Sequence, residues 1–585
     1  MSALASLVHA YERMTDAPPF GYSAEKIGFL ISLDEDGRPV GMPIDLREGE
    51  GKKKSPRTIL APQPAKRTSG IAPNFLWDKS SYVLAVTAGE GKRTTEEHTA
   101  FVARHVKDLT CADDVGLQAL VRFLGCWRPE DFDRLGWPED MKDANIVFAL
   151  ENERRQNICI HDRPAARALW AQFNAKDDAA PSACLVTGER GPIARLHPAI
   201  KGVWGAQSSG ASIVSFNLDA FASYGHEQGE NAPVSEAAAF AYTTALNRFL
   251  ERGSGHRTQI GDASTVFWAD ASDATGIGEA EGFFAALLGE DSVDETAETK
   301  KIAAILEAVR RGEPIETLTP KLPPAVRFYV LALAPNAARL SIRFFVEDDF
   351  REIAKRYLEH VGRMRIEPPR EAAPSIWRLL IETAAQRKSE NIPPQLAGDW
   401  LRAILTGAPY PLTLLSTLLM RMRADQDVNV LRVAMLKSVL LRNFATEKEA
   451  PVALDPDNDD PGYLLGRLFA TYEYAQTQAL GGSVNATIRD QYYGTASATP
   501  RSVFPLLQRK TTHHLAKLRK EKPGLAVNLD RKIGEICELS DPDAMFPATL
   551  NPRRQALFAI GYYHQRNDFY RSREEVANSS KEQHS

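Results

Sequence analysis

Basic side chains near the C-terminus recur at the spacing of a helix. At 100° per residue with Leu507 at zero, one set of residues falls within about 80° and a second set falls roughly opposite. The first set is apolar or small: Phe504, Thr511, Leu515 and Leu518. The second is basic: Arg509, His513, Lys517 and Lys520. The pattern predicts a helix over about 503–522 that packs on one face and could follow a phosphate backbone with the other, although a merely solvated charged face is the alternative.

A second concentration of positive charge lies between residues 47 and 67. Prolines keep this segment extended, and glycines loosen one end of it. Its cations suit phosphates, and its small polar side chains and amide suit base edges. The candidate phosphate contacts are Lys52, Lys53, Lys54 and Arg57, and the candidate DNA-reading residues are Lys66, Arg67, Ser69 and Asn74. A solvated basic loop remains the alternative.

A glycine-bearing loop over residues 201–210 is the third candidate binding segment. Gly205 and Gly210 permit a tight loop, which leaves Gln207, Ser208 and Ser209 at its tip. Such a tip can reach into a groove or wedge an amide between base pairs, because nothing bulky blocks its approach. The alternative is a Gly/Ser turn without a partner.

The elements that must position these residues change character along the chain. The first half mixes strands and helices, with a hairpin over 26–46 that turns at the Asp-Gly pair before Arg38. Further strands are predicted at 82–86, 146–150, 184–187 and 212–216, and helices at 97–106 and 165–173. A second hairpin is predicted from 328–333 and 339–345.

The strand signal ends near residue 350 and helical periods follow. They cover 349–361, 375–386, 395–405, 411–424, 428–444, 463–479, 503–522, 525–538 and 552–572. Residues 463–585 hold 17 Lys/Arg and 12 Asp/Glu, an excess of +5, whereas the whole chain is −5. The predicted fold class is therefore α+β and multidomain. The predicted domains are a mixed α/β region (1–365), a helical connecting region (366–446), an acidic linker (447–462) and a basic helical bundle (463–585).

Composition limits the classes of function. A chain of 585 residues with 43% hydrophobic and 25% charged content is typical of a globular protein with several domains. A net charge of −5 argues against a protein that binds polyanions over its whole surface, but not against local basic patches. Five scattered cysteines without a CxxC pair suit a reducing cytoplasm, and no apolar run is long enough for a membrane helix. We therefore expect a cytoplasmic location and no membrane partner.

Motifs for catalysis or metal binding are absent from the sequence. It contains no P-loop, Rossmann fingerprint, HExxH or GxSxG. His513 and His514 point about 100° apart on a helix, so they do not suit one ion. His161-Asp162 and His226-Glu227 are isolated pairs, for which a surface or hydrogen-bonded histidine is the default. We expect no catalytic residue, no metal and no cofactor.

Several long strings give the chain a family resemblance. They lie at Arg67-Thr-Ser-Gly with Pro73-Asn-Phe-Leu, Ser223-Tyr-Gly-x-Glu-Gln-Gly-Glu-Asn-Ala-Pro-Val-Ser-Glu, Ala241-Tyr-Thr-Thr-Ala-Leu-Asn, Ala334-Pro-Asn-Ala-Ala-Arg-Leu, Tyr463-Leu-Leu-Gly-Arg-Leu-Phe and Val484-Asn-Ala-Thr-Ile-Arg-Asp-Gln-Tyr-Tyr-Gly. The chain resembles the large subunit of the type I-C CRISPR effector complex (Cascade). The matching segments span nearly the whole chain.

The resemblance implies a DNA reader without catalytic activity. In such complexes a crRNA held by backbone subunits reads the target by base pairing, while the protein reads a short flanking motif, the PAM. The large subunit opens the duplex beside that motif, nucleates the R-loop and helps to hold the displaced strand. It also recruits a separate helicase–nuclease. The implied partners are therefore the backbone subunits, crRNA, target double-stranded DNA, the displaced strand and that enzyme.

The resemblance also assigns roles to the candidate segments. Lys66, Arg67, Ser69 and Asn74, with Gln207, Ser208 and Ser209, would contact the flanking duplex, and Lys52–Lys54 with Arg57 would hold its phosphates. Arg509, His513, Lys517 and Lys520 would hold the displaced strand. The C-terminal bundle would resemble the small subunit, which internal translation could produce from a start at Met435 or near Val452. A nuclease of the same defence system and a purely structural scaffold remain the alternatives.

Overall fold

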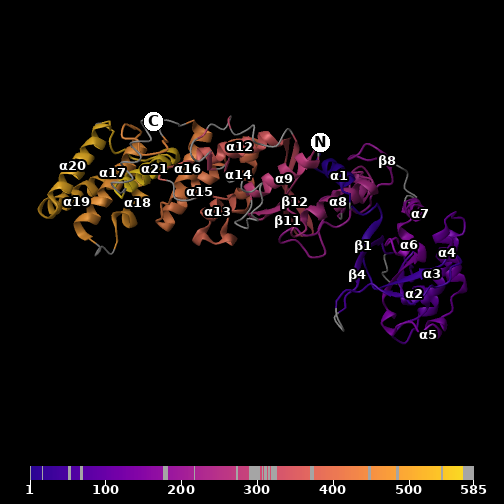
Figure 1. The fold of residues 1–585 in the computed structure, drawn as a ribbon. Coiled ribbons are helices and arrows are strands. Elements are labelled where there is room, and N and C mark those ends of the chain that lie inside the picture. The colour runs from indigo at the N-terminus through magenta and orange to yellow at the C-terminus, as the bar shows by residue number, and fades with distance from the viewer. Residues whose placement is uncertain are drawn as a thin grey trace. The chain divides into compact units, whose positions relative to one another are not determined.

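The computed structural model divides the chain into two compact units (Figure 1). The N-terminal unit comprises residues 2–198 and 214–246, and the C-terminal unit is drawn from residues 199–213 and 247–585. Each unit is described by itself. The residues that the structure describes are 2–15, 17–49, 54–65, 70–174, 182–216, 218–271, 274–288, 304–305, 307–308, 313, 317, 326–368, 374–445, 450–481, 486–541 and 544–570.

The N-terminal unit is a mixed α/β structure. Its elements in chain order are α1 (Ala3–Arg13), β1 (Tyr22–Ile27), β2 (Phe29–Leu33), β3 (Ile44–Asp45), β4 (Arg57–Pro62), β5 (Asp78–Lys79), α2 (Ser80–Leu84), α3 (Thr94–Leu109), α4 (Val115–Cys126), α5 (Asp131–Arg134), η2 (Glu139–Met141), β6 (Asn145–Leu150), α6 (Glu151–Arg154), η3 (Ile160–Asp162), α7 (Pro164–Asn174), β7 (Ser182–Ala183), β8 (Arg190–Gly191), η4 (Asp219–Phe221), η5 (Gln228–Asn231) and the start of α8 (Glu236–Leu250). The boundary between the two units falls inside α8, after Leu246.

A four-stranded mixed sheet forms the centre of this unit. Its strand order is β3-β2-β6-β5, in which β2 and β6 are parallel, with Phe29 opposite Ile146. Every residue of β2 is buried, as expected for an inner strand covered on both faces. Apolar side chains from α2, α3, α4 and α7 complete a core with the sheet. The sheet and these helices therefore share one apolar core.

The predicted hairpin over 26–46 is confirmed in its second part. β2 and β3 are antiparallel, and Gly37 donates its backbone N–H to the Asp34 carbonyl in the turn between them. The predicted first strand, however, divides at Gly28, whose N–H bonds to the Asn145 carbonyl. The part before Gly28 is β1, which pairs with β4 in a separate two-stranded ribbon, with Tyr22 opposite Pro62 (Figure 1).

Three predicted strands of the first half are wrong. Residues 82–86 lie in and after helix α2, in which all five residues are buried. An apolar run buried on all sides carries no period that separates a strand from a helix. Residues 184–187 form a turn after the short strand β7, and residues 211–212 form only isolated bridges. The strand at 146–150 is confirmed as β6, and the helices at 97–106 and 165–173 are confirmed as α3 and α7.

One buried histidine ties α3 to the segment that follows β4. His105 has no exposed surface, and its Nε2 accepts a hydrogen bond from the Leu76 backbone N–H at 2.8 Å. Its Nδ1 therefore carries the proton and donates it to the Phe101 carbonyl at 2.8 Å. Burial lowers the pKa of His105 to about 3. The ring is neutral in the folded protein.

This neutral ring predicts a loss of stability in acid. Below about pH 6.5 the unfolded chain takes up a proton that folded His105 refuses until about pH 3. The free energy of unfolding should therefore fall with pH in this window, by on the order of 1.4 kcal/mol per pH unit for this group. Urea unfolding of His105→Gln from pH 7 to pH 4 should show a shallower pH dependence than the wild type.

The exposed His9 in α1 supplies the control for this prediction. His9→Gln replaces an exposed histidine rather than a buried one, so it should leave the pH dependence as it is in the wild type. An unchanged pH dependence in His105→Gln would contradict the assigned role of His105.

The C-terminal unit begins with a sheet and continues as helices. Its elements are the end of α8, β9 (Arg257–Ile260), β10 (Ala263–Asp270), α9 (Ala274–Leu288), β11 (Arg327–Asn336), β12 (Arg339–Asp349), α12 (Phe350–Arg363), α13 (Ile376–Ile381), η7 (Ala385–Arg387), η8 (Ser389–Asn391), α14 (Pro394–Thr406), α15 (Leu412–Asp425), α16 (Val430–Phe444), α17 (Pro461–Leu480), α18 (Ile488–Ala498), α19 (Pro500–Glu521), α20 (Pro523–Glu538) and α21 (Pro552–Asp568). The predicted fold class, mixed α/β followed by a helical C-terminal half, is confirmed. Among the described residues, no helix combines the length and apolar character needed to cross a membrane.

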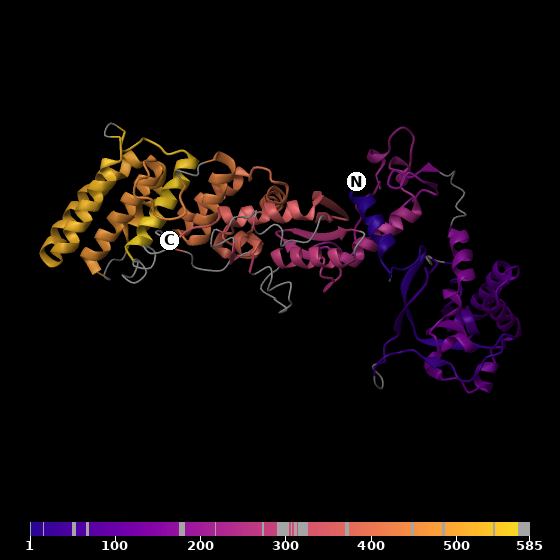
Figure 2. The ribbon, with the colours of Figure 1, turned by 45° about the horizontal axis from the view of Figure 1, so that its top comes forward.

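The sheet of this unit has the order β12-β11-β10-β9, with all pairs antiparallel. The predicted hairpin over 328–345 is confirmed as β11 and β12, with a bulge where Leu333 pairs with Ile342 instead of Arg343. One hydrophobic core extends from this sheet through α12–α16 into α17–α21. In Figure 2, α17, α19, α20 and α21 lie side by side as the orange-to-yellow helices of this unit.

The described part of the predicted acidic linker, residues 450–460, forms hydrogen bonds with neighbouring segments. Arg467 of α17 is 2% exposed and donates to the backbone carbonyl of Pro456 at 2.8 Å. Tyr463 accepts a hydrogen bond from the Asp455 N–H, and the Val452 carbonyl accepts one from the Glu367 N–H. The predicted boundaries at 365/366 and 446/447 do not coincide with the division into two units. The predicted division of the chain into these domains, including a basic helical bundle over 463–585, stays a prediction.

Glycines allow α17 and α21 to approach closely. A Cβ at Gly466 would lie 2.1 Å from the Phe558 carbonyl oxygen, and a Cβ at Gly561 would lie 2.2 Å from the Tyr463 carbonyl oxygen. Both obstacles are backbone atoms, which cannot rotate away as a flexible side chain can. The contact therefore requires glycine on both helices, and it fixes the helix pair against which α19 packs.

Candidate nucleic-acid interface

The basic segment of the N-terminal unit extends from the β1–β4 ribbon. Glu48 and Ser55 pair across its base, and β4 begins at Arg57. The basic segment therefore precedes β4 at the end of the ribbon where Ile27 of β1 pairs with Arg57 of β4. Five of the predicted contacts lie outside the described residues: Lys52, Lys53, Lys66, Arg67 and Ser69.

The described cations of this segment are already paired with carboxylates. Lys54 contacts Asp45 at 2.7 Å, and Arg57 lies 3.8 Å from Glu48. Hydrogen bonds from Arg47, and then from Lys54, hold the pKa of Asp45 below its usual range. A phosphate must compete with these carboxylates for Lys54 and Arg57. Both cations are more than a third exposed, so their ion pairs are weak and exchangeable.

The amide of Asn74 is a structural group in this fold. Its side chain is 3% exposed, and its Oδ1 accepts a hydrogen bond from the Ala65 N–H at 3.0 Å. Its own backbone N–H donates to the buried Asp78 at 2.8 Å. The sequence pattern could not show this burial. Contact between Asn74 and a base edge stays a prediction, and we leave this residue out of the surface proposed below.

The loop over residues 201–210 belongs to the C-terminal unit and is closed at its base. Ile200 and Ala211 exchange both backbone hydrogen bonds, at 2.8 and 2.9 Å. The Lys201 N–H donates to Asn247 at 2.7 Å. Gly210 has φ +96°, and a Cβ there would lie 2.9 Å from the Ile200 carbonyl oxygen. The loop is thus a fixed projection, which we call the glycine-framed loop.

The tip of the glycine-framed loop is exposed, as predicted. Gln207, Ser208 and Ser209 are all exposed. The structure adds Trp204, which is 62% exposed although its backbone N–H is anchored to Ser264 at 2.9 Å. An exposed indole on a fixed loop is a platform on which a base can stack. A tryptophan between two glycines was the sequence signal for it, and sequence reasoning missed it.

The two predicted faces of α19 are confirmed. The packing face is buried against α17, α18 and α20 and comprises Phe504, Leu507, Thr511, Leu515 and Leu518. The opposite face is exposed and comprises Arg509, His513, Lys517 and Lys520. We call the second set the basic face of α19. Its contact with a displaced strand stays a prediction.

The pKa of His514 reflects the positive charge concentrated along this part of α19. Partial burial, and then the neighbouring His513, Lys510 and Lys517, lower the pKa of His514. Lys517 is only loosely paired, at 3.9 Å from Glu521. By contrast, Arg519 lies beside the basic face and contacts Asp530 of α20 at 2.9 Å. The structure therefore separates cations that face solvent from cations already engaged by acids.

A comparison with known families bears on these surfaces. A family model described as CRISPR-associated protein (Cas_Csd1) matches residues 7–570. The chain belongs to the Cas_Csd1 family. No curated protein gives a significant match. The predicted assignment to CRISPR defence is thus confirmed at the level of the family.

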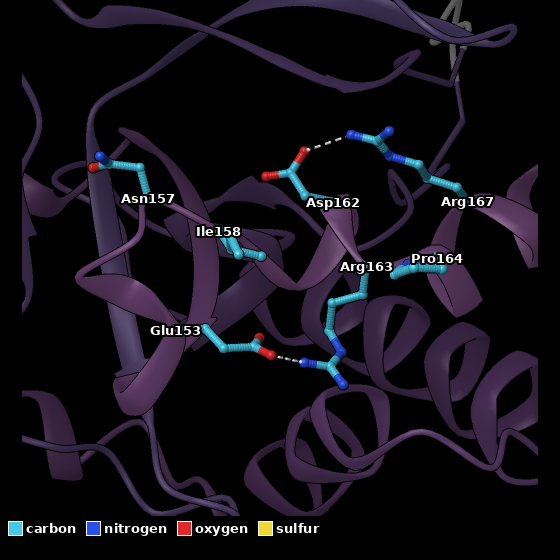
Figure 3. Close-up of a pocket in the computed structure, with 7 residues that line it drawn as sticks. All are labelled: Glu153, Asn157, Ile158, Asp162, Arg163, Pro164 and Arg167. Carbon is cyan, nitrogen blue, oxygen red and sulfur yellow. Dashed lines mark hydrogen bonds and ion pairs between the residues drawn. The ribbon is translucent and has the colours of Figure 1, made fainter.

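This Cas_Csd1 chain also has a polar cavity in the N-terminal unit, with a volume of about 500 Å³ (Figure 3). Its charged side chains form two pairs, Glu153 with Arg163 and Asp162 with Arg167, the latter at 3.4 Å. Arg163 also contacts Asp114 at 2.9 Å. Because the opposite charges offset one another, the cavity presents no excess charge to a ligand. Its lining residues are Glu153, Asn157, Ile158, Asp162, Arg163, Pro164 and Arg167.

Proposed function

We propose that this chain is the large subunit of a type I-C, RNA-guided DNA surveillance complex. It reads the flanking motif of duplex DNA, nucleates the R-loop and holds part of the displaced strand. A separate helicase–nuclease, recruited by the complex, cuts the DNA, and the chain itself performs no catalysis. Backbone subunits with crRNA and a small subunit from internal translation complete the assembly.

The observation that carries the proposal is the exposed basic face of α19 in a chain of a CRISPR-associated family. Cations one helical turn apart can neutralise successive phosphates without reading sequence. The fixed, exposed tip of the glycine-framed loop supports motif reading, since hydrogen bonds from an amide can distinguish base edges. The two surfaces thus suit different parts of one task.

The test of motif reading is Gln207→Ala in the complex assembled with backbone subunits and guide RNA. Loss of one base-edge contact should cost about 1–3 kcal/mol, or roughly 5- to 150-fold in affinity, for targets with the correct flank only. Gel shifts with matched and mismatched flanks measure this. Trp204→Ala should instead weaken binding to all flanks, because stacking tolerates any base.

Gln172→Ala is the control, since this glutamine is exposed on α7. It should change neither affinity nor motif preference. If Gln207→Ala behaves like this control, the glycine-framed loop does not read the motif. A scaffold without DNA readout predicts that outcome, together with indifference to the flank in the wild type. A nuclease would cut DNA as the purified chain with Mg²⁺ or Mn²⁺.

A further inference from the structure

A cysteine, a histidine and an aspartate converge on one short turn of the N-terminal unit. Cys159, His161 and Asp162 each place one potential metal-ligating atom within 4.8 Å of the other two. The His161 Nε2 lies 3.9 Å from the Asp162 Oδ2. Cys159 immediately precedes the turn η3, and the other two residues belong to it.

Within the described part of the chain, the side chain of His161 is buried without forming a hydrogen bond. Its side chain has no exposed surface, and neither ring nitrogen has a hydrogen-bond partner among the residues that the structure describes. The ring lies near the backbone of Leu60 in β4, but no hydrogen bond of acceptable geometry joins them. A buried polar group is costly when it is unsatisfied, so such a group needs an explanation.

The turn that carries the three residues is fixed by its surroundings. Tyr22 of β1 donates to the His161 carbonyl at 2.6 Å. The Cys159 N–H donates to the Asp162 Oδ2 at 3.0 Å, and the Asp162 N–H donates back to the Cys159 carbonyl at 3.0 Å. Cys159 is buried in an apolar cluster with Ile27 of β1 and Ala61 of β4. The backbone is therefore held in place before any ligand arrives.

From this arrangement we propose that Cys159, His161 and Asp162 form a binding site for Zn²⁺. One sulfur, one imidazole nitrogen and one carboxylate oxygen are the donor types that zinc binds in proteins. Asp162 also lines the polar cavity of Figure 3, which gives an ion a path from solvent. Three protein ligands leave the fourth position of a tetrahedral site for water from that cavity.

Two positively charged side chains near the site disfavour the binding of a cation. Arg167 contacts Asp162 at 3.4 Å, and the charge of Arg57 acts on Cys159. Burial raises the pKa of the Cys159 thiol to about 12. Binding of Zn²⁺ must therefore displace the proton of the Cys159 thiol. A coordinating metal favours this loss because it stabilises the thiolate. Arg57 and Arg167 should lower the affinity for the ion by repulsion. They leave Asp162 able to bind it, because Arg167 is half exposed and can turn to solvent.

The consequence of the site would be structural. The turn packs between β4 and β6, at the root of the ribbon that carries the basic segment. An ion held there would stiffen this turn, which contacts β4 and β6 and accepts a hydrogen bond from Tyr22 of β1. The inference rests on these residues alone, so it does not depend on the proposed function.

The experiment is a titration of the full-length chain, without an affinity tag, with Co²⁺ in place of Zn²⁺. We expect one bound ion per chain and a near-ultraviolet charge-transfer band from a thiolate bound to cobalt. Zn²⁺ should displace the cobalt and abolish the band. Cys159→Ser should remove the band, and Asp162→Asn should weaken cobalt binding at least about tenfold.

Cys184→Ser is the matched control, because Cys184 is also a buried cysteine of the N-terminal unit. It should leave the titration unchanged. Absence of a thiolate band in the wild type, or its persistence in Cys159→Ser, overturns the proposal. If Cys159→Ser fails to fold, the Asp162→Asn variant provides the test. Its side chain is partly exposed, so the substitution should be tolerated by the fold. An unchanged cobalt affinity in that variant likewise overturns the site and leaves His161 as a buried neutral ring.

Discussion

Gly466→Ala should destabilise the C-terminal unit by roughly 3 kcal/mol, the upper part of the range for overpacked cores. The added Cβ would lie 2.1 Å from the Phe558 carbonyl oxygen and 2.7 Å from the Tyr562 backbone nitrogen. Relief requires α17 and α21 to separate, and this opens the apolar contact along both helices. Urea unfolding of the full chain, followed at the transition of the C-terminal unit, measures the change.

Gly534→Ala in α20 is the control for this prediction. A Cβ at Gly534 would meet no atom of the described residues within 4 Å, so the position is sterically open. Alanine should therefore stabilise that helix by about 0.5–1 kcal/mol, because it loses less backbone freedom on folding than glycine. Opposite signs for the two substitutions would identify close packing as the cause. Equal effects would contradict the described approach of α17 and α21.

Local periodicity predicted much of this fold. The two faces of α19 follow from the residue spacing alone, because an amphipathic helix repeats its environment every turn. The hairpin of β11 and β12 was also visible, since Pro335-Asn-Ala-Ala interrupts two strand patterns. The helix α18 was missed. Its start is a capping box of Thr487 and Asp490, but its apolar period is weak.

Tertiary contacts decide what the sequence could not. Residues 82–84 are apolar on every side, so only their packing in α2 shows that they are helical. The division of one predicted strand at Gly28 depends on its bond to Asn145, more than a hundred residues later. The same holds for the candidate interface. The exposure of Gln207 was predictable from a glycine-rich loop, but the burial of Asn74 and the pairing of Lys54 with Asp45 come from distant segments.

The basic face of α19 gives the second large prediction. Replacing Arg509, Lys517 and Lys520 together with glutamine should weaken binding to single-stranded DNA regardless of sequence. Each lost phosphate contact removes up to about 0.7 from the slope of log K against log salt, so three contacts remove about 2. At 0.1 M salt this corresponds to roughly 100-fold in affinity, and the difference should shrink towards 1 M. Fluorescence anisotropy at several salt concentrations measures the slope.

A matched triple substitution separates the basic face from net charge. Its members are cations of α19 and α20 whose side chains already contact acidic or amide groups of α20: Arg519 with Asp530, Arg531 with Asn528, and Lys532 with Glu535. Changing these three to glutamine removes the same charge, but the lost cations were engaged before DNA arrived. The salt slope should therefore change much less than for the basic face. Equal slopes for the two triples would show that overall charge governs binding, and the basic face would then be a solvated surface.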